Sequence, residues 1–588
     1  MEDCRMSVIT VENLRYRYPH AKELALDGLD FSVEKGEFIG IIGENGAGKS
    51  TLSQAIMGLV PQFYKGAYGG TVMVDGIEAG RTTVAQLCGH VGLVFQNPFN
   101  QLSGAKDNVY EEVAFGMQNL GVPAEEMKNR VEEALKLLDI WQYRDRNPFD
   151  LSGGQMQRVA IASVLVMRPD VMILDEPTSQ LDPEGSDEVF KAVETLTGSG
   201  ITILMIEQKI EKLAAYCDRI LLLHKGKQIA FDTPQKVFSM PDLNNYGIQA
   251  PAFTRICKAE GVTLADGTYP VTVEEAAGVL REKRLGAPAC ADGGKCAQKA
   301  AGADVAGTDS AQAGGPSELA VSSDEQFCIK NLDFSYLADV PVLKKLNMKL
   351  DKCPTAIIGQ NGAGKTTLVK LLKGLLKPVS GSIYFHGEDI SGKTVAMLAG
   401  NVGYVFQNPD DQIFKYNVMD EILFGPLNIG MDAERAKKEA ERALKLTGLT
   451  GKEKENPYDL ELYERKMTAI ASVLAMDTDV LILDEPTIAQ DWKGRQIIGD
   501  IIRSLSERGK LVIAILHDMD FVAENFERVI IMAHGQVLAD GTAKEVFAQE
   551  EALKKARLQK PYVMQLCEAL GYEKSYLTVE ELLKDQVS

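Results

Sequence analysis

Short apolar runs, each of the length of a buried strand, recur along the chain and predict an α/β fold. Phe38–Ile42 and Thr355–Ile358 are each followed by a glycine-rich loop and then by a segment with apolar residues at helical spacing. Val171–Leu174 and Val480–Leu483 each end in a pair of carboxylates, and Leu511–Leu516 forms a further run of the same kind. We expect these runs to be the interior strands of sheets covered by helices.

The chain repeats itself, which indicates two domains of the same fold. Three segments recur in the same order and at a nearly constant offset: Gly43–Thr51 as Gly359–Thr367, Val91–Pro98 as Val402–Pro409, and Ile173–Asp182 as Ile482–Asp491. The match continues beyond them, because Pro251–Gly261 resembles Pro561–Gly571 and a TVEE segment follows each. Each half is therefore a complete domain that ends in a small helical subdomain.

The repeat and the composition together predict five regions. Residues 1–240 form the first domain and 241–285 its C-terminal subdomain, while 325–550 and 551–588 are their counterparts in the second half. Residues 286–324 are rich in Ala, Gly and Ser and almost lack large apolar side chains. Such a segment cannot bury enough surface to fold, so we predict a flexible linker.

Both halves contain the loop G-x-x-x-x-G-K-[ST] between an apolar strand and a helix, which is the context of a phosphate-binding loop. Its glycines let backbone N–H groups surround phosphates at a positive helix end. We expect Lys49 and Lys365 to reach the β- and γ-phosphates, and the hydroxyls of Ser50 and Thr366 to ligate Mg²⁺. The predicted ATP-binding residues are Gly43, Asn45, Gly46, Gly48, Lys49, Ser50 and Thr51 in half one and Gly359, Asn361, Gly362, Gly364, Lys365, Thr366 and Thr367 in half two.

An Asp-Glu pair follows the second apolar strand of each half. In an open α/β fold, the strand end delivers these carboxylates to the ligand-binding edge of the sheet. Asp175 and Asp484 are expected to hold Mg²⁺, and Glu176 and Glu485 to polarise the attacking water. Phosphoryl transfer needs mainly positioning and charge neutralisation, and these residues supply both.

The order of phosphate loop, VFQNP, LSGGQ, ILDEPT and a late histidine resembles the ATP-binding cassette (ABC) family over nearly all of both halves. The resemblance implies two P-loop ATPase domains in tandem, each with a helical signature subdomain and a small C-terminal subdomain, which sandwich ATP and Mg²⁺ between them. The further roles that it implies are adenine stacking by Tyr18 and Tyr336, metal or water contact by the Q-loop residues Gln96 and Gln407, γ-phosphate binding by the signature Ser152, Gly153, Gly154 and Gln155, a D-loop carboxylate at Asp182 and Asp491, and γ-phosphate sensing by the switch His517.

Two of these motifs depart from the pattern. A gapless alignment of the halves sets Leu460–Glu464 opposite Leu151–Gln155, so that Glu461 replaces the signature serine and Leu462 and Tyr463 replace its two glycines. These changes place an anion and two bulky side chains toward a phosphate. In half one, Gln208 stands where half two has its switch histidine, and glutamine cannot carry charge.

Because each site of the family takes its loop from one domain and its signature from the other, both departures fall in one composite site. We therefore expect a degenerate site built on Lys49, and a hydrolytic site built on Lys365, Glu485 and His517 and closed by the intact signature of half one. The alternative is that Gln208 is sufficient and both sites turn over.

Composition limits the class of cassette protein. The net charge of −20 and a pI of about 5.0 argue against wrapping nucleic acid, because that needs clustered Lys and Arg. No apolar run approaches the ~18–20 residues that cross a bilayer, and the N-terminus lacks a signal-peptide core, so we expect a soluble chain. Three classes remain open: a transporter ATPase, a soluble twin-cassette factor of translation or DNA repair, and a structural or regulatory clamp.

Segments after the Q-loop favour the transporter. NPDDQIF at Asn408–Phe414 and FGPLNIG at Phe424–Gly430 resemble the energy-coupling factor transporter ATPases, the cobalt and vitamin importer branch. The first half has NPFNQL and VAFG in the matching places and departs from that branch at Phe99. The resemblance implies a transmembrane coupling subunit, a small membrane subunit that captures the substrate, and a location at the cytoplasmic face of the cell membrane. The substrate-binding residues would lie outside this chain.

Overall fold

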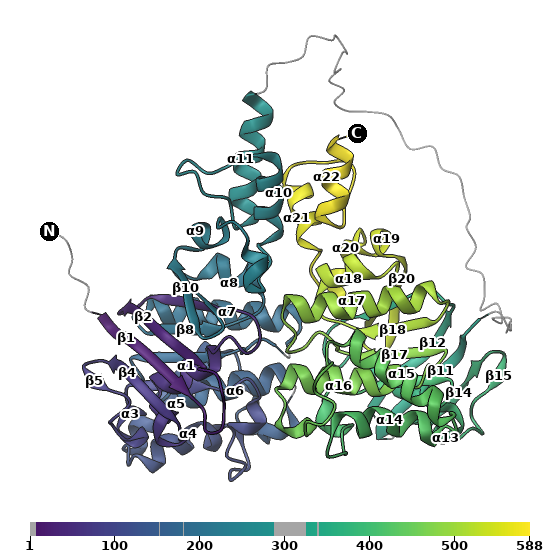
Figure 1. Cartoon of the computed structure of the whole chain (residues 1–588), viewed down its shortest axis with the longest axis horizontal. Coiled ribbons are helices and arrows are strands. Elements are labelled where there is room, and N and C mark those ends of the chain that lie inside the picture. The colour runs from purple at the N-terminus through teal and green to yellow at the C-terminus, as the bar shows by residue number, and fades with distance from the viewer. Residues whose placement is uncertain (1–6, 152, 180, 287–324, 338–339, 588) are drawn as a thin grey trace.

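The computed structural model describes residues 7–151, 153–179, 181–286, 325–337 and 340–587. Two α/β halves lie side by side, the first purple to teal and the second green to yellow in Figure 1. The predicted linker lies outside the described residues apart from Gly286, and so does Ser152.

Each half contains two sheets. In half one, the antiparallel sheet has the order β2-β1-β4-β5 (Leu26–Glu34, Ser7–Arg17, Ala67–Val74, Ile77–Glu78). The second sheet has the order β10-β9-β3-β8-β7-β6 (Lys227–Asp232, Arg219–His224, Phe38–Ile42, Thr202–Ile206, Val171–Asp175, Val91–Val94). All pairs in this second sheet are parallel except β9 with β10.

Half two repeats this arrangement. Its antiparallel sheet has the order β12-β11-β14-β15 (Val340–Leu350, Phe327–Leu337, Ser380–Phe385, Glu388–Asp389). Its second sheet has the order β16-β17-β18-β13-β19-β20 (Val402–Val405, Val480–Asp484, Leu511–Ile515, Thr355–Ile358, Arg528–Ala533, Gln536–Thr542). The predicted α/β class and tandem arrangement are therefore confirmed.

The apolar runs become interior strands because helices cover both faces of the second sheets. All residues of β3, β13 and β18 are buried. The helices next to the nucleotide loops and carboxylates are α1 (Lys49–Ile56), α7 (Pro183–Gly198) and α8 (Ile210–Tyr216) in half one and α12 (Lys365–Leu372), α17 (Trp492–Glu507) and α18 (Met519–Asn525) in half two. The signature helix of half one, α6 (Gly153–Leu165), packs with α4 (Val109–Asn119) and α5 (Ala124–Leu137). The signature helix of half two, α16 (Leu462–Leu474), packs with α14 (Val418–Asn428) and α15 (Ala433–Leu446).

Short helices complete the two halves. They are α2 (Leu59–Gln62), α3 (Val84–Leu87) and α9 (Pro234–Phe238) in half one, and α13 (Val395–Leu398), α19 (Ala543–Phe547) and α20 (Glu550–Lys555) in half two. Among the helices that the structure describes, none combines the length and the apolarity needed to cross a membrane.

The C-terminal helices of the two halves share one hydrophobic core. They are α10 (Ala252–Glu260) and α11 (Val273–Gly286) of half one and α21 (Tyr562–Ala569) and α22 (Val579–Val587) of half two. Phe253 and Ile256 are buried in the same cluster as Leu566 and Leu582. Burial of several such side chains contributes about 1.5–3 kcal/mol each, which makes this cluster a stable joint between the halves.

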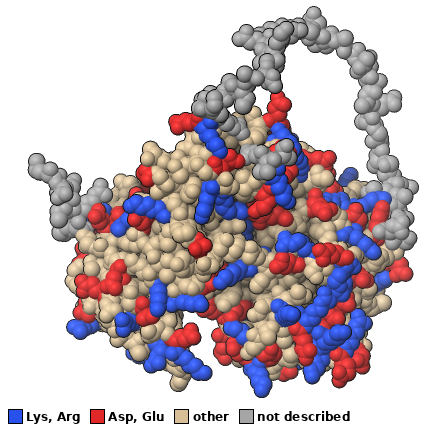
Figure 2. All heavy atoms as spheres, turned by 45° about the horizontal axis from the view of Figure 1, so that its top comes forward, with Lys and Arg blue, Asp and Glu red and all other residues tan. Residues whose placement is uncertain are grey.

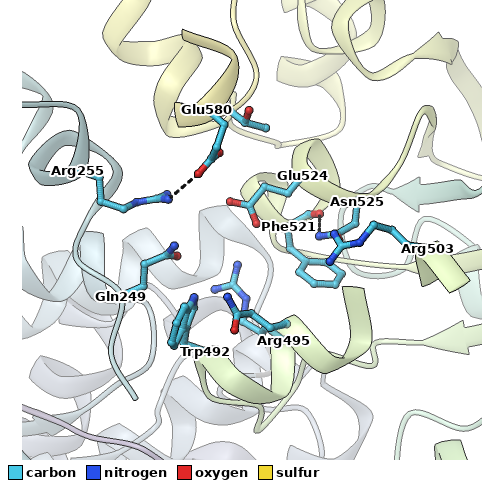
Figure 3. A pocket seen from close by; sticks show the side chains of 11 residues that line it. Gln249, Arg255, Trp492, Arg495, Arg503, Phe521, Glu524, Asn525 and Glu580 are labelled. Carbon is cyan, nitrogen blue, oxygen red and sulfur yellow. Dashed lines mark hydrogen bonds and ion pairs between the residues drawn. The ribbon is translucent and has the colours of Figure 1, made fainter. Parts of the chain in front are cut away.

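A hollow of about 300 Å³ lies beneath this joint. Figure 3 shows Arg255 of α10 pointing toward Glu580 of α22, with 3.6 Å between their charged atoms. Trp492 and Arg495, at the start of α17, line the opposite side. The hollow therefore separates the C-terminal joint from the helix that follows the D-loop of half two.

Candidate functional site

The phosphate loop of half two connects β13 to α12 through a conformation that requires glycine. Gly359 has a φ of 151°, and a Cβ atom on it would lie 2.1 Å from the carbonyl oxygen of Met532. The buried Lys365 donates to the carbonyls of Gly359 at 2.7 Å and of Gln360 at 3.0 Å. In half one, Lys49 donates to the carbonyls of Gly43 and Glu44 in the same way. Both lysines therefore lie against the carbonyls of their own loops, and their contact with phosphates stays a prediction.

The carboxylates of half two converge where β17 ends. Glu485, which is 7 % exposed, accepts from Gln407 Nε2 at 2.9 Å and lies 3.0 Å from His517 Nε2. Burial by itself would raise the pKa of this carboxyl. The charge and hydrogen bond of His517, together with Lys365 and Lys466, outweigh burial and hold the pKa below its ordinary value. Glu485 is therefore kept ionised, as a general base requires.

Half one arranges its glutamate differently. Glu176 accepts from Gln96 Nε2 and Gln208 Nε2, each at 2.6 Å, so that Gln208 takes the place that His517 has beside Glu485. Burial raises the pKa of Glu176 to about 7, and the effect of Lys49 is opposed by Asp175 and Glu207. The two glutamates thus occupy the same place in the fold but differ in their ease of ionisation.

Two residues of the half-two site escaped the sequence-based prediction. Lys466, which is 2 % exposed, donates from α16 to the carbonyls of Phe406 at 3.1 Å, Gln407 at 2.6 Å and Asp484 at 3.3 Å. Tyr404 donates its hydroxyl to Asp484 Oδ2 at 2.9 Å. Half one has glutamine and leucine, respectively, at these positions. A comparison of the two halves could therefore have singled out Lys466 and Tyr404.

The halves exchange contacts across their interface. Asp491 Oδ2 accepts from the backbone N–H of Asn45 at 2.9 Å, and Asp182 Oδ2 accepts from that of Asn361 at 3.2 Å. Each D-loop carboxylate therefore touches the phosphate loop of the opposite half. The half-one loop has further partners, because Asn45 Nδ2 donates to the carbonyl of Ala489 at 2.9 Å and Glu44 pairs with Lys493 at 2.8 Å.

The altered signature of half two faces the half-one loop. A Cβ atom on Gly46 would lie 3.8 Å from Glu461 Oε1. Burial and Glu464 raise the pKa of Glu461, and the charge of Lys49 opposes them. The composite arrangement that the family resemblance implies is thus present on this side of the interface. For the other signature, Gly153 and Gly154 open α6, while Ser152 lies outside the described residues.

The predicted adenine-binding tyrosines lie beside their loops. Tyr18 exchanges a hydrogen bond with Thr51 Oγ1 at 3.1 Å and donates to Gln54 at 3.0 Å. Tyr336 is 59 % exposed, and its hydroxyl lies 3.4 Å from Thr367 Oγ1. The exposed ring of Tyr336 is available for stacking.

The donors near each phosphate loop fit a hard cation. Thr366 Oγ1 donates to Asp484 Oδ1 at 3.4 Å, and the Ser50 hydroxyl bonds to Asp175. These hydroxyl and carboxylate donors are all oxygen atoms, as Mg²⁺ prefers. When bound there, Mg²⁺ would neutralise phosphate charge.

Two phosphate loops, each contacted by the D-loop of the other half, define a pair of P-loop ATPase domains joined through those loops. The sequence profile described as "ABC transporter" matches residues 26–179 and 343–488. The chain belongs to the ABC transporter family and is a tandem ATPase of that family.

Whole-length relatives support this assignment. The chain is 37 % identical over 583 residues to an ABC transporter ATP-binding protein of Caldanaerobacter subterraneus, with 98 % of each chain covered. It is 37 % identical over 596 residues to one of Methanosarcina acetivorans, which covers 98 % of this chain and 92 % of the relative. Among solved structures, cbiO1 of Clostridium perfringens, part of the ABC transporter complex cbiONQ, is 37 % identical, with 41 % of this chain and 93 % of cbiO1 covered and a TM-score of 0.37.

Proposed function

We propose that this chain is the ATP-hydrolysing subunit of a membrane importer of the energy-coupling factor type, with one hydrolytic and one degenerate composite ATP site. The hydrolytic site is built on Lys365, Glu485 and His517 and is closed by the signature of half one. The degenerate site is built on Lys49 and faces Glu461. The single observation that carries the asymmetry is that His517 Nε2 lies 3.0 Å from Glu485 in half two, whereas Gln208 donates to Glu176 in half one.

At the hydrolytic site, the loop N–H groups and Lys365 bind and orient the phosphates of ATP. Glu485 accepts a proton from the attacking water as the oxygen of that water bonds to the γ-phosphorus, and the bond to the β-phosphate oxygen breaks. His517 orients Glu485 through their 3.0 Å contact and senses the γ-phosphate. Gln407 holds the other carboxylate oxygen and links the site to the Q-loop surface.

Paired substitutions test the asymmetry. Glu485→Gln removes the base from the hydrolytic site while keeping its shape, and ATPase activity should fall by about 10² or more. Glu176→Gln is the matched control in half one and should leave most of the activity. Equal losses from the two variants, measured as kcat at saturating Mg-ATP, would refute a single hydrolytic site.

The importer assignment rests on the surface beside the Q-loops. In half two, Phe414, Tyr416 and Phe424 are 50 %, 85 % and 38 % exposed, and Lys415 lies over the rings of Phe414 and Phe424. In half one, Phe99 and Phe149 are exposed and stack on each other at 6.0 Å. Exposed aromatic groups of this kind are typical of protein docking sites. We propose that a membrane coupling subunit docks one helix on each of these two aromatic groups.

The charge distribution disfavours the soluble translation or repair factor. On the face shown in Figure 2, basic and acidic side chains are interspersed and no broad basic patch is visible. Together with the net charge of −20, this leaves little electrostatic attraction for nucleic acid on that face.

Co-purification from native membranes tests the partners. The tagged chain should recover an integral membrane subunit, and Tyr416→Asp together with Phe424→Asp should abolish that recovery while leaving basal ATPase activity in place. A matched exposed pair away from the Q-loops, Glu388→Gln with Met397→Asp, should not affect it. Recovery of ribosomes or DNA without a membrane protein would support the alternative function.

A further inference from the structure

The altered signature of half two has not only lost the serine and glycines of half one but also forms hydrogen bonds of its own. Helix α16 begins at Leu462 with Glu461 as its N-cap, and Glu464 Oε2 accepts from the backbone N–H of Glu461 at 3.2 Å. Glu464 is held in turn by Lys452 and by the hydroxyl of Tyr463 at 3.2 Å. Two carboxylates of half two therefore occupy the positive end of its own signature helix.

A helix N-terminus binds phosphate because it offers unpaired N–H groups and a positive potential. At α16, Glu461 and Glu464 already supply negative charge to that end. The N-terminus of α16 therefore gives a γ-phosphate little electrostatic attraction, and its two carboxylates would repel one. Leu462 and Tyr463 also add bulk where half one has glycines.

The carboxylate of Glu461 is directed at the opposite half. Its Oε1 lies 3.8 Å from the position of a Cβ atom on Gly46, and the charges of Glu461 and Lys49 act on each other across the interface. An anion from the protein thus stands beside the half-one loop, at the position that aligns with the signature serine of half one. The loop remains equipped for the inner phosphates, because Lys49 and Ser50 are present and Asn45 is held by Asp491.

We propose that Glu461 takes the place of the γ-phosphate at the half-one loop, so that this site binds a nucleoside diphosphate in preference to a nucleoside triphosphate. The inference rests on the proposed function insofar as it treats the half-one loop as a nucleotide site. It assigns that site a ligand, ADP, which ABC ATPases produce, and it makes Glu461 the residue that determines specificity.

A displacement assay isolates this site. Lys365→Ala disables nucleotide binding by half two, and the remaining binding of fluorescent mant-ADP with Mg²⁺ reports half one. ADP should displace the probe at a lower concentration than AMP-PNP, a non-hydrolysable ATP analogue. Adding Glu461→Gln should shift the ratio of the two affinities toward AMP-PNP by about five-fold, which is the effect of removing one repulsive charge at a solvated interface.

Two further variants secure the result. Glu461→Ser restores the residue type that half one carries at position 152 and should shift the ratio in the same direction, which separates charge from any change in helix capping. Glu388→Gln, on the distant β15, should leave the ratio unchanged. The inference is overturned if AMP-PNP binds the Lys365→Ala chain as tightly as ADP or more tightly, if that chain binds no nucleotide, or if both Glu461 variants leave the ratio unaltered. None of these measurements depends on hydrolysis, so equal ATPase losses in Glu485→Gln and Glu176→Gln would refute the proposed function without deciding this question.

Discussion

Replacing His517 by glutamine would give the half-two site the side chain that half one carries as Gln208. The change removes the imidazole that lies 3.0 Å from Glu485 Oε1 and leaves Gln407 on the other carboxylate oxygen. Half one then serves as the reference, because Glu176 between Gln96 and Gln208 has a pKa of about 7. In His517→Gln, the pKa of Glu485 should therefore rise from below its ordinary value toward about 7.

The sign and size of the effect follow from the role of Glu485. The ionised carboxylate accepts the proton, so a raised pKa removes activity as the pH falls. A carboxyl with a pKa of 7 is about 91 % ionised at pH 8 and about 9 % ionised at pH 6, which predicts a fall of about ten-fold in kcat between them. Lys365 and Lys466 remain beside Glu485 and make this an upper bound. With His517 present, the fall over the same range should be much smaller.

The measurement is steady-state kcat at saturating Mg-ATP from pH 6 to pH 8.5, in a Glu176→Gln background so that half two alone is observed. The matched change is Gln208→His in a Glu485→Gln background, which should lower the pKa of Glu176 and flatten its residual profile. If His517→Gln lowers kcat by the same factor at every pH, the histidine does not act by keeping Glu485 ionised, and the electrostatic reasoning is wrong.

Two further changes test the packing around the site. Lys466→Met leaves three carbonyls without their charged donor and should lower the stability of half two by about 2–4 kcal/mol, or about 5–10 °C in its thermal midpoint by calorimetry. Gln157→Met is the matched change in half one. It should cost under about 1 kcal/mol, because the hydrogen bond of Gln157 to the Phe95 carbonyl is 3.5 Å long. Gly359→Ala forces a Cβ against the Met532 carbonyl and should abolish mant-ATP binding by half two, whereas Gly400→Ala meets nothing within 4 Å and should bind normally.

Sequence motifs predicted those features of the fold and the site that depend on a short stretch of chain. The strands before Gly359 and Asp484 could be read from apolar runs, and the loop geometry from its glycines, because both depend on short stretches of chain. The motif order that resembles the ABC family placed Glu485 and His517 in one site, but their 3.0 Å contact was not predicted. Tyr404 and Lys466 were visible as differences within the repeat, but their targets are known only once the strands are placed.

The resemblance implied composite sites between the halves, but the individual side-chain contacts between them were beyond prediction for a different reason. Glu44 and Lys493 lie 449 positions apart, and their pairing depends on how two folded domains dock. The repeat predicted helical C-terminal subdomains but gave no sign that they share one core, because Phe253 and Leu566 fit equally well into separate cores. Sequence patterns specify which faces are apolar, and the partner of each face is decided by the tertiary arrangement.

Fusion of the halves explains how such different sites can persist. In a dimer of identical domains, a carboxylate at the position of Glu461 would face both phosphate loops, and neither site would keep an intact signature. In the fused chain, the signature of half two faces only the loop that contains Gly46, and the D-loop contacts from Asp491 and Asp182 hold each loop to its own partner. A change at Glu461 therefore acts on one site and spares the other. The same pairing lets Lys466 and Tyr404 specialise in half two, because they act within that half on the carbonyl and carboxylate of Asp484. One-to-one pairing is thus the physical condition under which one site can be adapted to hydrolysis and the other to retention of a nucleotide.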